Sequence, residues 1–397
     1  MYNLSALDYP RNTEPWQKPL ADRQAMLVQG KYKIAYYYEE FNNSSFRYRA
    51  YNMVESINER AERCGLSASY FCRADASVFR WLSRTADQLV VCRSGEEDYL
   101  LELISLFRDR LKPIIFDTDD LVVDPSYARQ IAYAVGQDLG LPETLNYWHA
   151  YTSRMRAVAL RCDAICTTNK YLSRLASSSL GVRGLVIQNS MNMGQLKFSK
   201  MLYEQKRRQP SARSQRFTIG YFSGSPSHLR DFAMMSEALA ALMSQRDDAE
   251  LLICGFIELS DSLLPFRDRV IVEPFRDHLS LQGLIAKCEI SIAPLEYSTF
   301  TNCKSELKYF ESAVVGTLCI ASPTFVFRSV IEHGVNGWIS RSHQWGDVLN
   351  MALDLQEQER AQMMQNACGS ALSRFGPEAL WQALVKSFAL KSQLTIP

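Results

Sequence analysis

The sequence has no run of about 18 consecutive apolar residues, so we expect no helix that spans a membrane. Its first residues, MYNLSALDYPRNTEPWQKPL, are polar and lack the basic and then apolar order of a secretory signal. Neither sign of charge dominates, because 44 lysines and arginines stand against 43 aspartates and glutamates. This balance gives no indication of nucleic acid as a partner. Together these absences predict a cytoplasmic protein.

Metal-binding and nucleophilic motifs are also missing. The ten cysteines are scattered singly, and the one close pair, Cys162 and Cys166, has no companions at zinc spacing. The five histidines show no ligand spacing, and the chain has neither a G-x-S-x-G elbow nor a Walker phosphate loop. We therefore expect no metal and no cofactor, and we expect the cysteines to be buried free thiols.

Short apolar runs alternate with longer amphipathic stretches along both halves of the chain. This alternation predicts an α/β fold with parallel strands joined by helices, and 397 residues suffice for two such domains. The strands expected in the first half are 33–38, 68–72, 88–92, 113–117, 164–168 and 185–189. Those expected in the second half are 217–222, 250–255, 269–274, 290–295, 318–322 and 337–340. The helices expected between and after them include 47–62, 97–109, 142–161, 228–244, 279–287, 304–315, 326–333 and 377–391.

A basic segment, residues 200–216, interrupts the alternation. It contains Pro210 and almost no apolar periodicity, so we interpret it as the connection between two domains. The predicted units are therefore residues 1–205, residues 206–375 and a closing helix over 376–397. Both domains are expected to be doubly wound and to bind ligands in a cleft between them, because ligands bind at the carboxyl ends of parallel strands.

The most informative segment is TNCKSELKYFESAVVGTLCIASP, residues 301–323. On a helix over 304–315, Lys304, Lys308 and Glu311 share one polar stripe. If this helix begins at the cleft, its free backbone N–H groups and Lys304 suit a diphosphate. Glu311 lies about two turns further along and is suited to accept hydrogen bonds from a ribose diol. The alternative interpretation is a solvated helix face that binds nothing.

This segment resembles the nucleotide-binding core of GT-B-fold glycosyltransferases, especially the family 4-like enzymes that build bacterial surface polysaccharides. The form K-S-E-L-K-Y-F-E, followed by A-x-x-G and I-A-S-P, is similar to a subgroup found in O-antigen and capsule clusters. The segment IEHGVNGWI (331–339) extends the likeness, which covers the C-terminal half well and the N-terminal half loosely. The resemblance implies two Rossmann-like domains, with the acceptor bound by 1–205 and a nucleotide-sugar donor by 206–375.

By position, the resemblance implies that Glu311 binds the donor ribose and that Lys304 contacts the pyrophosphate. Many such enzymes have a second glutamate at the position that Cys303 occupies here, so the stereochemistry stays open. The implied activity is that of a hexosyl- or deoxyhexosyltransferase that acts on a growing surface polysaccharide or lipid-linked glycan and needs no metal. The alternatives are a nucleotide-sugar epimerase of the same fold and, given Cys303, a catalytically inactive GT-B partner subunit.

A loop after the first strand of the C-terminal half, GYFSGSPSHLRD (220–231), is a second candidate for donor binding. Gly224 lets the backbone approach a ligand, and Ser225 is able to donate a hydrogen bond or to cap the next helix. The loop is not G-x-G-x-x-G, and its spacing alone is also typical of an ordinary turn. The resemblance favours contact with the donor pyrophosphate, with His228 as a weaker candidate for the same role.

Two segments of the N-terminal half lie at the ends of predicted strands and are candidates for an acceptor or phosphate site. SSFRYRAYN (44–52) follows a strand and opens a helix, which places Ser45 and Arg47 to meet an anion. VVCRS closes another strand and directs Arg93 toward the same cleft. Ordinary surface charge is the alternative interpretation of Arg47.

The acidic cluster FDTDD ends a further strand and is the best candidate for the catalytic group. Its members are Asp117, Asp119 and Asp120. A carboxylate beside an acceptor hydroxyl serves as the base that an inverting transfer needs, and the alternative is that the cluster caps the next helix. A strand followed by D-x-D also resembles the phosphatase motif of haloacid-dehalogenase-like enzymes, but Leu121 stands where that family has Thr or Val.

One helical segment suggests membrane contact. YWHAYTSRMRAVALR (147–161) mixes aromatic and arginine side chains, as an interfacial helix does, although packing on its own sheet explains the pattern better. Because the implied product is lipid-linked, we expect peripheral contact with the inner face of the cytoplasmic membrane.

Overall fold

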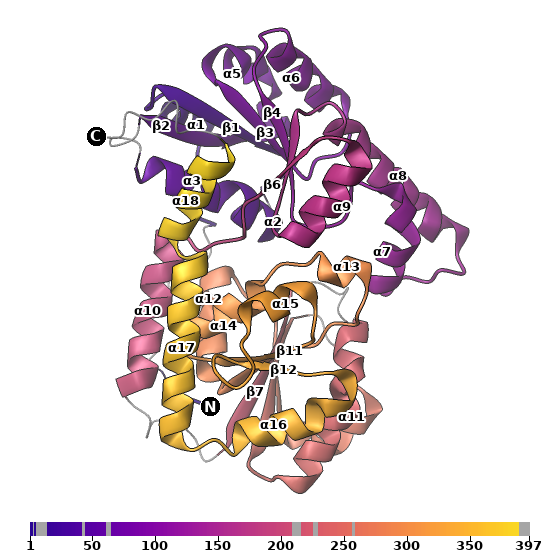
Figure 1. Cartoon of the computed structure of the whole chain (residues 1–397), viewed down its shortest axis with the longest axis vertical. Coiled ribbons are helices and arrows are strands. Elements are labelled where there is room, and N and C mark those ends of the chain that lie inside the picture. The colour runs from indigo at the N-terminus through magenta and orange to yellow at the C-terminus, as the bar shows by residue number, and fades with distance from the viewer. Residues whose placement is uncertain are drawn as a thin grey trace.

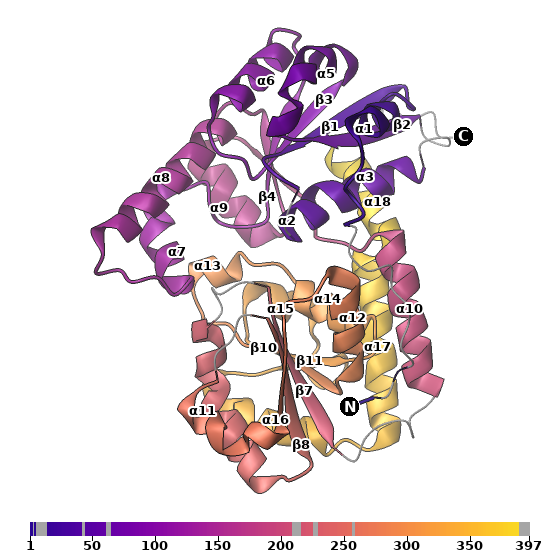
Figure 2. The same cartoon turned by 180° about the vertical axis from the view of Figure 1, so that it is seen from behind.

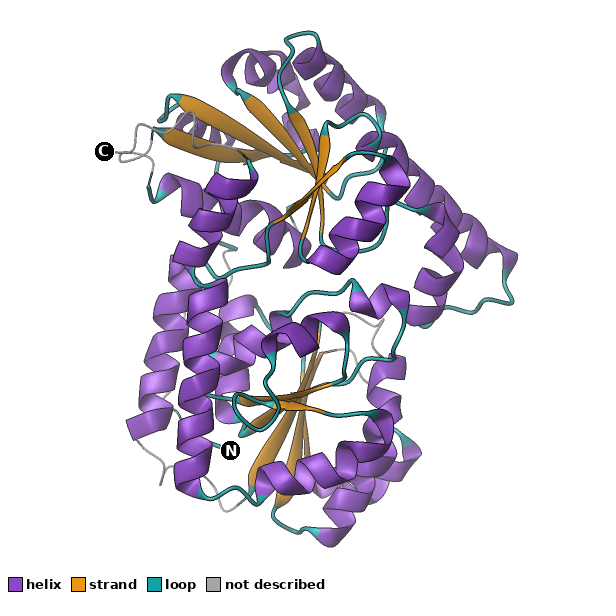
Figure 3. Cartoon of the chain, in the orientation of Figure 1, coloured by secondary structure: helices purple, strands orange, loops and turns teal. Residues whose placement is uncertain are grey.

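The computed structural model describes residues 1, 2, 4, 14–41, 44–60, 65–208, 216–224, 229–255 and 259–388. These residues form two α/β domains, one above the other in Figure 1, each built on one six-stranded sheet. Figure 3 shows the strands as a middle layer with helices on both sides in each domain. The predicted architecture of two doubly wound domains is confirmed.

The N-terminal sheet has the order β2-β1-β3-β4-β5-β6, and every neighbouring pair is parallel. Its strands are β1 Tyr32–Tyr38, β2 Leu66–Phe71, β3 Gln88–Cys92, β4 Ile114–Thr118, β5 Ala164–Thr167 and β6 Arg183–Val186. The direction of winding changes between β1 and β3, and such a switch point opens a crevice at the carboxyl ends of the strands.

The C-terminal sheet has the order β12-β11-β10-β7-β8-β9 and is also parallel throughout. Its strands are β7 Phe217–Ser223, β8 Ala249–Gly255, β9 Val270–Glu273, β10 Ile290–Ala293, β11 Leu318–Ala321 and β12 Trp338–Ile339. Here the switch point lies between β7 and β10, so the loop after β7 lies at the place where doubly wound folds bind ligands.

The helices follow the strands in the alternation that the sequence predicts. Those before β7 are α1 Leu20–Leu27, α2 Ser44–Phe46, a π-helical turn Arg47–Tyr51, α3 Asn52–Asn58, α5 Phe79–Thr85, α6 Asp98–Arg108, α7 Ala128–Ala134, α8 Pro142–Ala159, α9 Lys170–Leu180 and α10 Met193–Arg208. Those after β7 are α11 Leu229–Gln245, α12 His278–Lys287, α13 Thr299–Asn302, α14 Leu307–Ala313, α15 Phe325–Val330, α16 Trp345–Leu353, α17 Glu357–Phe375 and α18 Pro377–Ser387. Short 3-10 helices cover Arg73–Val78, Pro125–Tyr127, Asp261–Arg269 and Ser342–Gln344.

The strands are buried because helices cover both faces of each sheet. Every residue of β3 and β4 is buried, which explains why these strands are continuous apolar runs rather than alternating patterns. Two apolar clusters fill the two faces of the N-terminal sheet, and one large cluster fills the C-terminal domain. None of the helices in the described ranges combines the length and the apolar character that crossing a bilayer requires.

The helix predicted over 304–315 is wrong at its amino end. Helix α13 occupies Thr299–Asn302, a turn follows over 303–306, and α14 begins only at Leu307. Lys304 therefore does not share a helix with Lys308. The cause is tertiary, because Asn169 of the N-terminal domain donates hydrogen bonds to the carbonyl oxygens of Cys303 and Lys304. The periodicity of apolar and polar residues within a segment contains no information about such contacts with another domain.

The segment predicted as a connection, residues 200–216, is helical as far as Arg208. Two of the apolar side chains of α10, Phe198 and Leu202, are buried in the C-terminal core. The basic residues that suggested a linker, Lys206, Arg207 and Arg208, form the last turn of α10, where positive charge is favoured by the helix dipole. The helix runs across the boundary predicted after residue 205.

The chain passes between the domains more than once. After β6 it enters the C-terminal domain, where α10 packs against α12, and α18 returns to pack against α3 and β6. The two passages lie side by side along one edge of the molecule (Figures 1 and 2). Tyr2 also belongs to the C-terminal domain, since its backbone N–H donates to the carbonyl of Lys287 at 2.9 Å.

Candidate active site

An acidic cluster lies at the carboxyl ends of β3 and β4. The Ser45 hydroxyl donates to Asp119 Oδ2 at 2.6 Å, and Arg93 donates to Asp119 Oδ1 at 3.0 Å. Burial alone would raise the pKa of Asp119, but Arg93 and the Ser45 hydrogen bond hold it below its ordinary value. The backbone of Arg93 has φ 39°, in the left-handed region, and strain of this kind is concentrated at functional sites. Ser45, Arg93 and Asp119, all predicted site residues, therefore form one cluster.

The second aspartate of this cluster bridges the domains. The Lys304 ammonium donates to Asp120 Oδ2 at 2.9 Å, and Arg93 lies 3.7 Å from the same oxygen. Asp120 Oδ1 is buried without a hydrogen-bond partner in the described ranges of the chain. The predicted catalytic carboxylate and the predicted phosphate-binding cation are thus paired with each other across the domain interface.

Asp117 differs from its neighbours because it is enclosed. Arg49 binds both of its oxygens at 2.7 Å, and both side chains are buried. The same guanidinium donates to the carbonyl of Ile187 at 2.7 Å. This group therefore joins β4 to the helical segment after β1 and to the chain after β6, and it does not line the domain interface with Asp119 and Asp120.

Glu311, on α14, also faces the N-terminal domain. The hydroxyl of Tyr48 donates to Glu311 Oε1 at 2.5 Å, and His278 Nδ1 lies 4.0 Å from the same oxygen. Burial raises the pKa of Glu311 to about 7, although the Tyr48 hydrogen bond and the charges of Arg47 and Lys308 lower it. Glu311 therefore changes its charge near neutral pH, in contact with both domains.

Lys308 lies one helical turn before Glu311. Its ammonium is buried, contacts the ring of Tyr221 at 4.6 Å from the centroid, and has no hydrogen-bond partner within the described part of the chain. Burial lowers the pKa of Lys308, while the charge of Asp231 raises it. A buried cation without a hydrogen-bonded partner near the end of β7 is a strong attractor for an anion.

The remaining predicted residues are placed as follows. Gly224 directly follows β7, and a side chain added there would meet nothing within 4 Å, so the space beside it is open. Ser225 and His228 lie outside the described residues. The guanidinium of Arg47 is buried over the ring of Trp16 at 4.6 Å and lies 3.4 Å from Glu14.

The N-terminal domain holds the turn before α14 through contacts that the sequence did not suggest. Asn169 binds the turn backbone, and Gln188 donates to Glu306 Oε1 at 3.0 Å. Burial raises the pKa of Glu306 to about 7. Cys303 is fully buried in a small apolar cluster with Leu121 and Phe300, so at this position the chain has an interdomain packing group.

Tyr48 and His278 are the site residues that sequence reasoning missed. Tyr48 lies inside the segment 44–52, next to the predicted Arg47. The signal that could have found it is its position on a helix that opens at a strand end. His278 is the first residue of α12, and only the fold brings it to Glu311. Within the described ranges, no three His, Cys, Asp or Glu side chains are grouped so that they could hold a metal ion.

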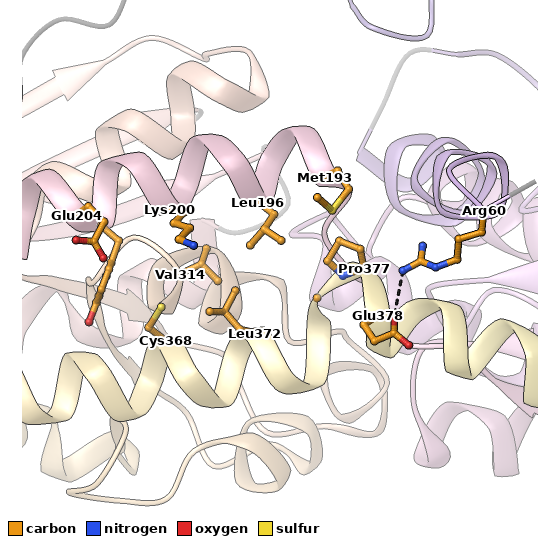
Figure 4. Close-up of a pocket in the computed structure, with 12 residues that line it drawn as sticks. Arg60, Met193, Leu196, Lys200, Glu204, Val314, Cys368, Leu372, Pro377 and Glu378 are labelled. Atoms are coloured by element: carbon orange, nitrogen blue, oxygen red, sulfur yellow. Dashed lines mark hydrogen bonds and ion pairs between the residues drawn. The ribbon is translucent and has the colours of Figure 1, made fainter. Parts of the chain in front are cut away.

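A cavity of about 470 Å³ lies elsewhere, between α10 and α17 (Figure 4). Its walls are mostly apolar, with Leu196 and Leu372 among them, and the ion pair of Arg60 with Glu378 at 3.0 Å lies at one end. It contains none of the predicted site residues. The polar and charged side chains suited to a nucleotide sugar therefore lie at the domain interface and not in this cavity.

Comparison with known protein families gives a match over the C-terminal domain. Residues 216–357 match the family model described as glycosyl transferases group 1. The match covers the whole C-terminal sheet, from β7 to β12. No curated protein matches the sequence significantly.

Solved structures show the fold of the whole chain. HepE of Anabaena, solved with UDP and glucose, has a TM-score of 0.60 at 15% identity over 90% of this chain and 99% of its own. A glycosyltransferase from Rickettsia africae has a TM-score of 0.61 at 12% identity over 90% and 97% of the two chains. WaaG, a glycosyltransferase of lipopolysaccharide biosynthesis, has a TM-score of 0.58 at 14% identity over 89% and 99%. The GT-B fold and the glycosyltransferase class predicted from the sequence are confirmed.

Proposed function

We propose that this glycosyltransferase transfers a hexose or deoxyhexose from a nucleotide-diphosphate sugar to a growing bacterial surface polysaccharide or lipid-linked glycan. The observation that carries the proposal is the buried ammonium of Lys308, which has no hydrogen-bond partner among the described residues. It lies one turn from the Glu311 carboxylate, in a domain that matches the group 1 family model. A cation and a hydrogen-bond acceptor that lie one helical turn apart suit the phosphate and the ribose of one nucleotide.

In the proposed complex, Glu311 accepts hydrogen bonds from the ribose hydroxyls, and Lys308 and Lys304 bind the diphosphate. Gly224, beside open space at the end of β7, lets the backbone approach the same group. The relatives support a uridine nucleotide, since HepE was solved with UDP and with UDP-glucose. The likeness to WaaG, which takes part in lipopolysaccharide biosynthesis, supports an acceptor from surface polysaccharide synthesis, and with it peripheral contact with the cytoplasmic membrane.

In the proposed reaction, an acceptor hydroxyl oxygen bonds to the anomeric carbon of the donor, and the bond from that carbon to the diphosphate oxygen breaks. The electron pair leaves with the diphosphate, whose charge Lys304 and Lys308 stabilise. Asp120 is the proposed base for the hydroxyl proton, because one of its oxygens has no partner among the described residues and the other is released when Lys304 binds phosphate. Asp119, held ionised by Arg93, binds the guanidinium that lies 3.7 Å from Asp120.

A thermal-shift screen against UDP-, GDP- and dTDP-sugars tests the donor site. One class of nucleotide should raise the melting temperature, since a ligand at a hundred times its Kd stabilises the folded state by about 2.7 kcal/mol. Lys308→Met should abolish the shift, whereas Lys200→Met, at an exposed position of α10, should leave it intact. If no nucleotide sugar moved the melting temperature of the wild type, the proposal would fail.

Cys303 favours one other candidate, a donor-binding subunit without transfer activity. The resemblance leads us to expect a carboxylate at this position, and the structure has a buried thiol packed between the domains. Incubation of the protein with the donor identified by the screen and a mixed pool of oligosaccharides separates the two functions. A radiolabelled product from the wild type indicates transfer, and donor binding without any product indicates the inactive subunit.

A further inference from the structure

Helix α8 carries aromatic and basic side chains, but the structure already uses the basic ones within the protein. Arg154 donates to the carbonyl of Glu96 at 3.0 and 2.7 Å, and Arg161, just beyond the end of α8, pairs with the carboxylate of Glu96 at 3.0 Å. Arg156 donates to Ser179 Oγ at 2.6 Å and to its carbonyl at 2.7 Å. A helix that binds anionic lipid needs cations directed outward, so these contacts argue against a membrane surface as the partner of α8.

Three aromatic side chains of α8 form one group, which we call the aromatic group: Tyr147, Trp148 and Tyr151. The rings of Tyr147 and Tyr151, one helical turn apart, are nearly parallel, with 19° between their planes and 6.1 Å between their centroids. Trp148 meets both edge-on, at 5.3 and 5.4 Å. Tyr147 is 55% exposed, so the group opens to solvent at its outer end.

Trp148 fixes this aromatic group to the protein. Its indole N–H donates to Gln137 at 2.6 Å, and its ring packs against the interdomain apolar cluster that contains Leu121 and Phe300. The aromatic faces are therefore held in place before any ligand arrives, which lowers the entropy that binding must overcome.

The aromatic group lies beside the loop that carries the acidic cluster. Trp148 packs against the apolar cluster that contains Leu121, and Leu121 directly follows Asp120 in the chain. Figures 1 and 2 show α7 projecting from the N-terminal domain beside α13 of the C-terminal domain, with α8 packed against α7. The aromatic group therefore lies near the candidate active site, with Tyr147 at its exposed end.

We propose that Tyr147, Trp148 and Tyr151 form a stacking subsite for pyranose rings of the acceptor glycan, next to its reacting end. This inference rests on the proposed function and names the class of its acceptor as an oligosaccharide rather than a monosaccharide. The C–H groups on one face of a pyranose are attracted to the electron-rich face of an aromatic ring, and the tyrosine hydroxyls supply hydrogen bonds at the rim.

The test is binding to an array of immobilised oligosaccharides cut from bacterial surface polysaccharides, in the presence of UDP. Tyr147→Ala should weaken binding about fivefold, a loss typical of one aromatic contact, and Tyr147→Phe should restore most of it because the ring is what stacks. Tyr99→Ala is the matched control, because Tyr99 is 51% exposed on α6, and it should bind as the wild type does.

Three results would overturn the inference: equal binding by Tyr147→Ala and the wild type, no binding of the wild type to any oligosaccharide, or an effect of Tyr147→Ala only on co-sedimentation with phosphatidylglycerol vesicles. The thermal shift with nucleotide sugars separates this failure from that of the proposed function. A wild type that binds the donor but shows no dependence on Tyr147 refutes the subsite alone. A wild type that binds glycans through Tyr147 but binds no nucleotide sugar refutes the transferase function.

Discussion

Tyr48 and Glu311 are 263 residues apart in the sequence, and the Tyr48 hydroxyl donates to the Glu311 carboxylate at 2.5 Å across the domain interface. The contact joins the helical segment after β1 to the short helix α14 of the C-terminal domain. Because Glu311 is the proposed ribose ligand, its protonation and its orientation both depend on a residue of the opposite domain. The first two predictions follow from this relationship.

Donor affinity should rise as the pH rises through about 7, the value to which burial raises the pKa of Glu311. The protonated carboxyl has lost acceptor capacity for ribose hydroxyls, whereas the ionised group accepts from both. Isothermal titration with the selected nucleotide sugar from pH 5.5 to 8.5 measures this dependence. Glu311→Gln should bind weakly at every pH, and a wild-type affinity that fell with rising pH would contradict the assignment.

Tyr48→Phe should move the midpoint of that pH profile upward. The Tyr48 hydrogen bond lowers the pKa of Glu311, so its removal leaves burial less opposed and the carboxyl protonated to higher pH. At pH 7 the donor should bind more weakly, and at pH 8.5 most of the loss should be recovered. A loss of affinity that is the same at both pH values would mean that Tyr48 acts on the ligand and not through Glu311.

Lys308→Met should stabilise the protein and abolish donor binding. The buried ammonium has no hydrogen-bond partner in the described chain, so its replacement by an apolar side chain of similar length removes a desolvation penalty of about 1–3 kcal/mol. Urea unfolding should show a higher midpoint than the wild type. A lower midpoint together with unchanged donor affinity would show that Lys308 is an ordinary core residue.

Asp120→Asn should separate binding from turnover. Lys304 loses its carboxylate partner at 2.9 Å and becomes available to the diphosphate, so donor affinity should increase. Turnover should fall by about 100-fold or more, the usual loss when a general base is removed. Asp124→Asn, a capping aspartate further along the same loop, should change neither. Turnover at the wild-type rate in Asp120→Asn would exclude Asp120 as the base.

Arg49→Met should destabilise the fold without a specific effect on the donor. It leaves the Asp117 carboxylate buried and unpaired, which costs about 3–5 kcal/mol in comparable pairs. Denaturant unfolding of the single variant and of Arg49→Met with Asp117→Leu provides the check. The double variant should have a higher free energy of unfolding than Arg49→Met alone. A lower value for the double variant would show that the unpaired Asp117 carboxylate is not what destabilises Arg49→Met.

The sequence was sufficient to predict the sheets. Each of the predicted strands overlaps a strand of one of the two sheets. Parallel strands that helices cover on both faces consist of unbroken runs of apolar residues, which are easy to recognise in a sequence. The candidate residues at strand ends were also predictable, since the carboxyl ends of parallel strands meet on one side of the sheet. Ser45, Arg93 and Asp119 come together for that reason.

Contacts between the domains were not predictable in the same way. The start of α14 at Leu307, rather than at Lys304, depends on hydrogen bonds from Asn169 to the turn before it. Lys304 pairs with Asp120, and Tyr48 with Glu311, only because the two domains are placed next to each other. Periodicity within one segment contains no information about that placement. Burial of Lys308 was missed because the residue looks polar on a helical wheel.

The way in which the chain passes between the domains limits how the molecule can be divided. The C-terminal domain includes Tyr2 and α10 as well as the sheet from β7 to β12, and the N-terminal domain includes α18 from the far end of the chain. A single cut in the polypeptide therefore deprives at least one half of an element that covers its core. Fragments made by truncation should expose apolar surface and aggregate, whereas joining the domains of two such enzymes into a hybrid requires at least three junctions.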